Sequence, residues 1–72
     1  MDDIIEKIEV WFTYHKPDEE QIEQYNRLRD AAKVFALAIA DNAPNCADRT
    51  AAFRKVREAV MEANAAIACR GV

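Results

Sequence analysis

The stretch from Tyr25 to Ala40, YNRLRDAAKVFALAIA, constrains the fold more than any other part of the chain. It predicts the middle of a long helix whose first half is charged on one face. Residues 34–40, in contrast, are apolar on nearly every side. A helix that is apolar all round is normally buried all round. A chain of 72 residues cannot easily bury such a helix alone, so we expect it to pack against its own chain and against another chain.

Association between chains is the stabilising device that the composition leaves open. Domains of this size often depend on disulfides, metal ions or oligomerisation. Cys46 and Cys69 form no C-x-x-C pattern, and on one helix they would lie about 34 Å apart, beyond the reach of a disulfide. His15 is the single histidine, and no paired metal ligands accompany it. We therefore expect free thiols in a reducing cytosol, with no metal and no cofactor.

Residues 1–17 predict a short helix followed by an extended arm. The apolar side of the short helix consists of Ile4, Ile5 and Ile8. The segment 10–16, VWFTYHK, is β-branched and aromatic, and Pro17 disfavours helix at the residue before it. We expect this arm to present Tyr14 and His15. No apolar run approaches the length needed to span a membrane, and residues 2–9 are too charged for a signal peptide.

Two long helices are predicted next, over residues 18–42 and 45–69. Asp18 and Gln21 have the spacing of a capping box, and Asn45 is the expected cap of the second helix. Apolar residues three or four apart form a seam on each helix, and folding about the turn pairs the seams at one register. The pairs are Phe35–Phe53, Ala32–Val56, Leu28–Val60, Tyr25–Ala63 and Ile22–Ile67. The prediction is one all-α domain of residues 1–72, an antiparallel helical hairpin that assembles into a helical oligomer.

A band of basic side chains is predicted on one flank of this hairpin. At 100° per residue, Arg29 and Lys33 share a flank of the first helix. Thr50 and Arg57 share a flank of the second helix, with Arg54 a little further round. Such a band is often an ordinary solvated face. It also suits an anion site, because arginine matches phosphate bidentately and lysine supplies a point charge.

The sequence argues against an enzyme and against a general nucleic-acid binder. His15 has no nucleophile at a diagnostic position, and there is no glycine-rich phosphate loop. The net charge is −3, whereas proteins that bind DNA or RNA polymers are usually basic. The charge is uneven, since acids dominate residues 1–25 and bases dominate residues 26–72. We expect a small anionic ligand, with no nucleic-acid polymer and no membrane as partner.

Three segments, taken together, resemble one known family. They are FTYHKP at 12–17, QIEQYNRLRDAAKVFA at 21–36 and RTAAFRKVREAVMEANAAIA at 49–68. They resemble the helical-hairpin domain of phage anti-CBASS protein 2, a family of small viral sponges for the cyclic oligonucleotide signals of bacterial immunity. The resemblance implies a compact hexamer in the cytoplasm of the infected bacterial host. It implies that cyclic dinucleotides such as cyclic GMP-AMP, and in some members cyclic trinucleotides, are sequestered between protomers without being cleaved.

The resemblance also implies site residues. In the family, a tyrosine of the N-terminal region and a basic residue of the first long helix hold the dinucleotide phosphates. Tyr14, beside His15, matches the tyrosine, and Lys33 or Arg29 matches the basic residue. The candidates for a second, more basic pocket are Thr50, Arg54 and Arg57. Glu62 departs from the family, which commonly has an aromatic residue there, and an extra carboxylate at an interface would affect ligand choice or assembly.

One alternative function stays open at this point. A structural or regulatory hairpin that binds only protein would leave its basic band solvated, or would pair it with acids of a neighbouring chain, such as those in residues 18–23. An enzyme that degrades the signal would need a metal or an acid–base pair, and the sequence offers neither.

Overall fold

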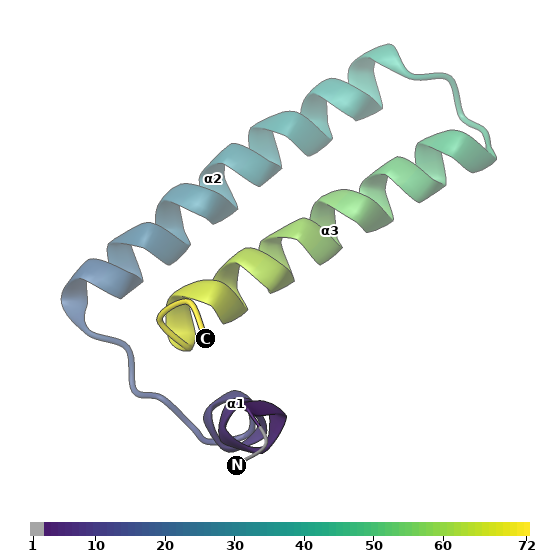
Figure 1. The fold of residues 1–72 in the computed structure, drawn as a ribbon. Coiled ribbons are helices and arrows are strands. Elements are labelled where there is room, and N and C mark those ends of the chain that lie inside the picture. The colour runs from purple at the N-terminus through teal and green to yellow at the C-terminus, as the bar shows by residue number, and fades with distance from the viewer. Residues whose placement is uncertain (1–2) are drawn as a thin grey trace.

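The computed structural model describes residues 3–72, and three helices dominate them (Figure 1). α1 spans Asp3–Trp11, α2 spans Glu19–Asn42 and α3 spans Ala47–Ala68. α2 and α3 run antiparallel side by side, and α1 lies at the end of the hairpin opposite the turn. The described residues contain no strand, so the predicted all-α hairpin with a short N-terminal helix is confirmed. None of the helices in residues 3–72 combines the length and apolar character needed to cross a bilayer.

The start of α2 is fixed by the predicted capping box. The Asp18 carboxylate accepts a hydrogen bond from the Gln21 backbone N–H at 2.8 Å, and the Gln21 side-chain oxygen accepts one from the Asp18 N–H at 3.0 Å. Two otherwise unpaired donors of the helix start are thereby satisfied. The hydrogen bond from the Gln21 backbone, helped by the nearby Arg70 guanidinium, lowers the pKa of Asp18 below its usual 3.8.

The N-terminal helix is longer than predicted, and the arm is correspondingly shorter. Val10 and Trp11 were expected in the extended arm, but both belong to α1. The Phe12 N–H continues the helical pattern by donating to the Ile8 carbonyl at 3.1 Å. Trp11 is also held from outside the helix, because its Nε1 donates to the Val72 carbonyl at 3.0 Å. The effect of Pro17 reaches only the residue before it, so nothing ends the helix as early as residue 10.

The predicted cap of α3 is wrong. Cys46, not Asn45, occupies the N-cap position, and its side chain makes no capping hydrogen bond. The helix begins two residues later than the predicted 45, which places Asn45 before the cap. The other end of α3 is also shorter, since Cys69 is the C-cap and Gly71 follows with φ +83°. Arg70, which stands between Cys69 and Gly71, has φ +52°, and this left-handed residue brings the Gly71 N–H to the Ala66 carbonyl at 2.9 Å, which closes the helix end.

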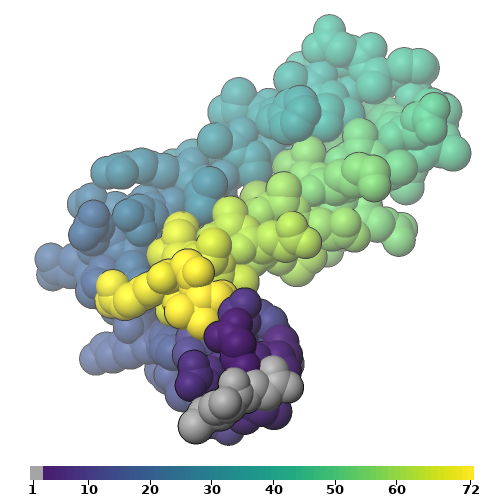
Figure 2. All heavy atoms as spheres, viewed as in Figure 1, coloured from purple at the N-terminus to yellow at the C-terminus, as the bar shows by residue number. Residues whose placement is uncertain are grey.

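The arm and the end of α3 close one end of the hairpin. The Gln21 side-chain amide donates to the Ile67 carbonyl at 3.0 Å, and Arg70 lies 3.3 Å from the Asp18 carboxylate. Figure 2 shows the C-terminal residues, in yellow, against the purple α1. Gln21 and Cys69 are the two buried residues in the described part of the chain, and both lie at this end. The two cysteines are free, as predicted.

The middle of the hairpin is open. Val34 and Leu37, from the stretch that is apolar all round, are 68% and 56% exposed. The radius of gyration is 15.6 Å, against about 11 Å expected for a compact domain of this length. The accessible surface is 5973 Å², against about 4,500 Å² for a compact folded chain of 8.2 kDa. The single chain therefore leaves its central helix uncovered, as expected for a subunit that packs on another chain.

Candidate functional site

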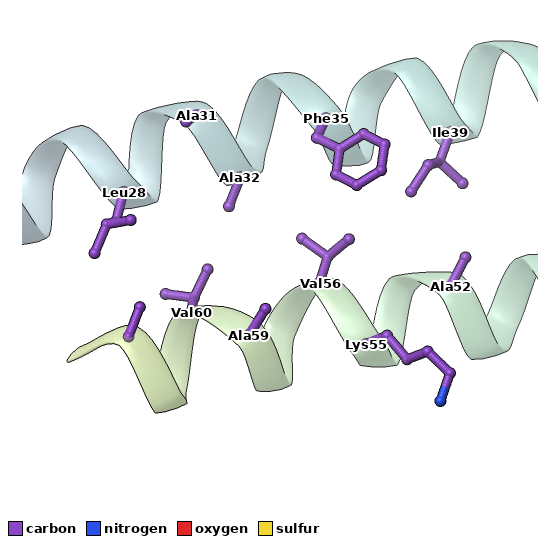
Figure 3. Close-up of a pocket in the computed structure, with 11 residues that line it drawn as sticks. Leu28, Ala31, Ala32, Phe35, Ile39, Ala52, Lys55, Val56, Ala59 and Val60 are labelled. Carbon is purple, nitrogen blue, oxygen red and sulfur yellow. The ribbon is translucent and has the colours of Figure 1, made fainter. Parts of the chain in front are cut away.

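An apolar groove of about 590 Å³ runs between α2 and α3. Figure 3 shows Leu28, Phe35 and Ile39 directed from α2 toward α3, with Val56 and Val60 directed back. The remaining lining residues are Ala31, Ala32, Ala52, Lys55, Ala59 and Ala63. These residues include the central part of the predicted seam. Since the Lys55 ammonium is the single charged group in this lining, the groove is suited to packing and not to holding an anion.

The predicted basic band lies away from this groove, along the middle of the hairpin. Arg29, Lys33, Arg54 and Arg57 are all exposed. Within residues 3–72, the side chains of Lys33, Arg54 and Arg57 make no ion pair and no hydrogen bond. Arg29 donates to the Asn26 side-chain oxygen at 3.3 Å. Thr50, one turn into α3, donates its hydroxyl to the Cys46 carbonyl at 3.4 Å.

Several other cations of the chain already have partners. Lys7 pairs with Asp3 at 3.2 Å, and Arg27 pairs with Glu23 at 3.4 Å. Arg49 donates to the Ala40 carbonyl at 3.2 Å, and its guanidinium stacks 5.2 Å from the centre of the Phe53 ring. The mid-hairpin band therefore contains three cations that are unpaired within the described residues, Lys33, Arg54 and Arg57. An unpaired arginine or lysine keeps its full capacity for a bidentate or point-charge contact with phosphate.

The arm presents Tyr14 at the closed end of the hairpin. Tyr14 is 82% exposed, whereas the neighbouring His15 is held by a 2.7 Å hydrogen bond between its Nε2 and the Val10 carbonyl. This bond fixes the arm against α1 and leaves the Nδ1 of His15 without a partner in the described residues. A pocket of about 470 Å³ lies beside the arm. Its lining consists of Val10, Tyr14, His15, Lys16, Gln21, Ala68, Cys69, Arg70 and Val72.

This pocket contains two cations that the sequence analysis did not assign to a site. Lys16 and Arg70 both line it together with Tyr14. Arg70 was interpreted only through the helix dipole, although the hairpin register, extended beyond the seam, places it level with Asp18 at the start of α2. The register was thus the signal that would have found it. Because Arg70 is already engaged by Asp18, Lys16 is the less committed of the two cations.

A single chain does not bring Tyr14 to the basic band. Lys33 lies fourteen residues beyond the start of α2 at Glu19, which is about 21 Å along the helix axis. The arm turns toward α1 and the C-terminal residues instead of running along the hairpin (Figure 1). Thr50 and Arg54 lie further still, toward the turn. A site that combines Tyr14 with Lys33 therefore requires two chains.

No metal centre is formed within residues 3–72, where no three His, Cys, Asp or Glu residues are grouped to hold an ion. A family model described as "Acb2/Tad1, hairpin domain" matches residues 4–68. The match spans α1 from Ile4 onward, the arm, α2 and all of α3. No curated protein and no solved structure matches the chain.

Proposed function

Because the chain belongs to the Acb2/Tad1 hairpin-domain family, we propose that it binds and sequesters cyclic oligonucleotide second messengers. The proposed ligands are cyclic dinucleotides such as cyclic GMP-AMP, with cyclic trinucleotides as a second class. The proposed setting is the cytoplasm of an infected bacterium, where removal of the signal blocks CBASS immunity. The family match over residues 4–68 carries this proposal, and the unpaired cations of the mid-hairpin band support it.

The proposed dinucleotide site combines groups from two protomers. Lys33 or Arg29 of one chain and Tyr14 of another hold the phosphates, and the Tyr14 ring stacks on a base. The Nδ1 atom of His15 adds a polar group to the site, and the hydrogen bond between its Nε2 and the Val10 carbonyl keeps the arm in place. The proposed second pocket uses Thr50, Arg54 and Arg57, which lie nearer the turn. We propose a homo-oligomer, with the hexamer as its expected size.

Sequestration requires no catalytic group, because the ligand leaves the solution without any bond being broken. Its effectiveness depends on the number of sites and on a dissociation constant below the signal concentration that activates the immune effector. A pair between a phosphate and a cation is stronger where the contact between chains excludes water from it. Stacking of a base on an aromatic ring adds about 1–3 kcal/mol. A site shared between protomers also couples ligand affinity to assembly.

A second candidate is a hairpin that binds only protein. The exposed apolar side chains of Val34 and Leu37 favour it, because such residues normally mark contact surfaces. In that case the basic band would be solvated or would pair with acids of another chain. The two candidates differ in one respect: only the sponge needs a free cation band and an exposed Tyr14 for a small ligand.

Calorimetric titration of the purified protein with cyclic di- and trinucleotides tests the proposal. The mass of the protein in solution is measured in parallel. The protein is then heated to release the ligand, which is recovered and analysed. We expect about one site per chain, because each site takes Tyr14 from one chain and Lys33 from another, and we expect the ligand to be returned intact. A well-assembled protein that binds no member of the panel would contradict the proposal. Recovery of linear nucleotides in place of the cyclic ligand would also contradict it, because it would show that the protein is an enzyme that cleaves the ligand.

A further inference from the structure

The outer surface of α3 on the groove side carries two opposite charges seven residues apart. At 100° per residue, Lys55, Ala59, Glu62 and Ala66 fall within about 60° of one another around the helix. All four residues are exposed. Figure 3 shows the Lys55 side chain extending away from α2, so it does not help to close the hairpin. Arg57 lies on the other side of α3, which separates this surface from the basic band.

Neither charge on this surface is used inside the chain. Within residues 3–72, Lys55 and Glu62 form no ion pair and no side-chain hydrogen bond. They are two helical turns apart, so they cannot pair with each other along their own helix, where partners lie three or four residues apart. Between them lies the small side chain of Ala59, which permits close approach of another helix.

The shape of the chain indicates a large missing contact. The accessible surface exceeds that of a compact chain of this mass by roughly 1,400 Å². A standard protein interface buries about 800 Å² on each partner, so the excess is more than enough for one such interface. Lys55 and Ala59 also line the groove between α2 and α3, whose other lining residues are apolar.

We propose that this surface packs on the same surface of a second copy, with the two α3 helices antiparallel. A two-fold axis near residues 58 and 59 places Lys55 of each chain opposite Glu62 of the other. The contact is self-complementary, as a two-fold interface requires, and it forms two ion pairs around a small-residue centre. A second copy of this helix that runs the other way carries opposite charges at the matching spacing of seven residues.

The nearest competing pairing is less favourable. Arg27 of a partner could face Glu62 if the hairpins were stacked with α2 over α3, but Arg27 already pairs with Glu23. Lys55 and Glu62 are both unengaged, so their pairing breaks no existing contact. The proposed contact leaves Arg29 and Lys33 uncovered. It requires no ligand and is tested without one.

Charge reversal tests the contact. We expect Lys55→Glu and Glu62→Lys each to weaken self-association by about tenfold or more, because either change creates two like-charge contacts per dimer. The double variant, Lys55→Glu with Glu62→Lys, restores both pairs with their signs exchanged and should return association to the original level. Sedimentation velocity over a range of protein concentrations, without ligand, measures the effect. Asp30→Lys is the matched control, since this charge points away from α3 and its reversal should leave association unchanged.

The double variant makes the test decisive. Self-association that remains as weak in the double variant as in either single one would overturn the proposal, as would single variants that associate normally. Rescue of Glu62→Lys by Arg27→Glu would assign Glu62 to the competing pairing and would also overturn it. Because ligand binding is measured separately by calorimetry, a failed contact and a failed ligand proposal give different results.

Discussion

Lys33→Ala is expected to weaken binding of a cyclic dinucleotide by about 10- to 100-fold, with the fold unchanged. Hydrogen bonds to charged groups contribute about 1.5–3 kcal/mol each, and more is lost when the partner phosphate stays buried without one. Lys33 makes no ion pair and no hydrogen bond through its side chain in the described chain, so its removal disturbs no internal contact. Calorimetric titration measures the loss, and the melting temperature and the mass in solution show that the assembly persists.

Lys7→Ala is the matched control for this prediction. It removes the same charge from α1, where Lys7 pairs only with the neighbouring Asp3 at 3.2 Å. Ligand affinity should stay within a factor of about two, because an exposed pair of this kind contributes little. Equal losses of affinity in the two variants would show that the effect comes from net charge and not from a site at Lys33.

Gln21→Ala is expected to lower the melting temperature by about 10 °C or more. Gln21 is only 7% exposed, and its side chain joins the start of α2 to the Ile67 carbonyl on α3. Alanine removes the partner of the Asp18 N–H and the link to the Ile67 carbonyl, which keeps only the Arg70 N–H, at a cost of about 2–3 kcal/mol in the free energy of unfolding. In a domain of this size each kcal/mol corresponds to about 4–8 °C. Thermal unfolding followed by circular dichroism, at a fixed protein concentration, measures the change.

Gln24→Ala separates this role from a general effect of losing a glutamine. Gln24 lies one turn further along α2, lines the same shallow pocket as Gln21, and makes no side-chain hydrogen bond in residues 3–72. Its replacement should shift the melting temperature by no more than about 2 °C, since alanine is also the better helix former. If the Gln21→Ala and Gln24→Ala proteins have the same melting temperature, the contact between Gln21 and Ile67 is not formed in solution.

The parts of the fold that follow local rules were predictable from the sequence. Asp18 and Gln21 are three residues apart, so their capping box depends on nothing distant. The seam of α2 and α3 follows from helical periodicity, which fixes both the faces and the register. The helical hairpin was therefore predictable, and Leu28 and Val60 of the predicted seam both line the groove.

The errors arose where distant contacts decide the outcome. α1 extends through Trp11, whose indole N–H donates a hydrogen bond to a carbonyl sixty-one residues away. No local sequence pattern predicts that hydrogen bond. The cap of α3 was misplaced because several polar and small residues surround the turn, and the helix begins only at Ala47. An error of one residue in a predicted helix end changes which residue is the cap, whereas it leaves the seam along the rest of the helix unchanged.

The candidate site was predictable in its parts but not in its assembly. Helical periodicity placed Arg29 and Lys33 on one flank of α2, and the structure leaves Lys33 unpaired. The sequence could not show that His15 holds the arm to Val10, which keeps Tyr14 far from Lys33 in one chain. That separation follows from long-range contacts at the C-terminal end of the hairpin. It is also the reason that the proposed ligand site must be built from two chains.

The most direct test of this claim mixes two defective chains. Tyr14→Ala and Lys33→Ala proteins are unfolded together in equal amounts, refolded as mixed assemblies and titrated with cyclic dinucleotide. If a site takes Tyr14 from one chain and Lys33 from another, about a quarter of the sites in a randomly mixed symmetric oligomer regain both residues and bind with the original affinity. Binding no tighter than that of the two separate variants would show that both residues act within one chain, or that neither forms the site.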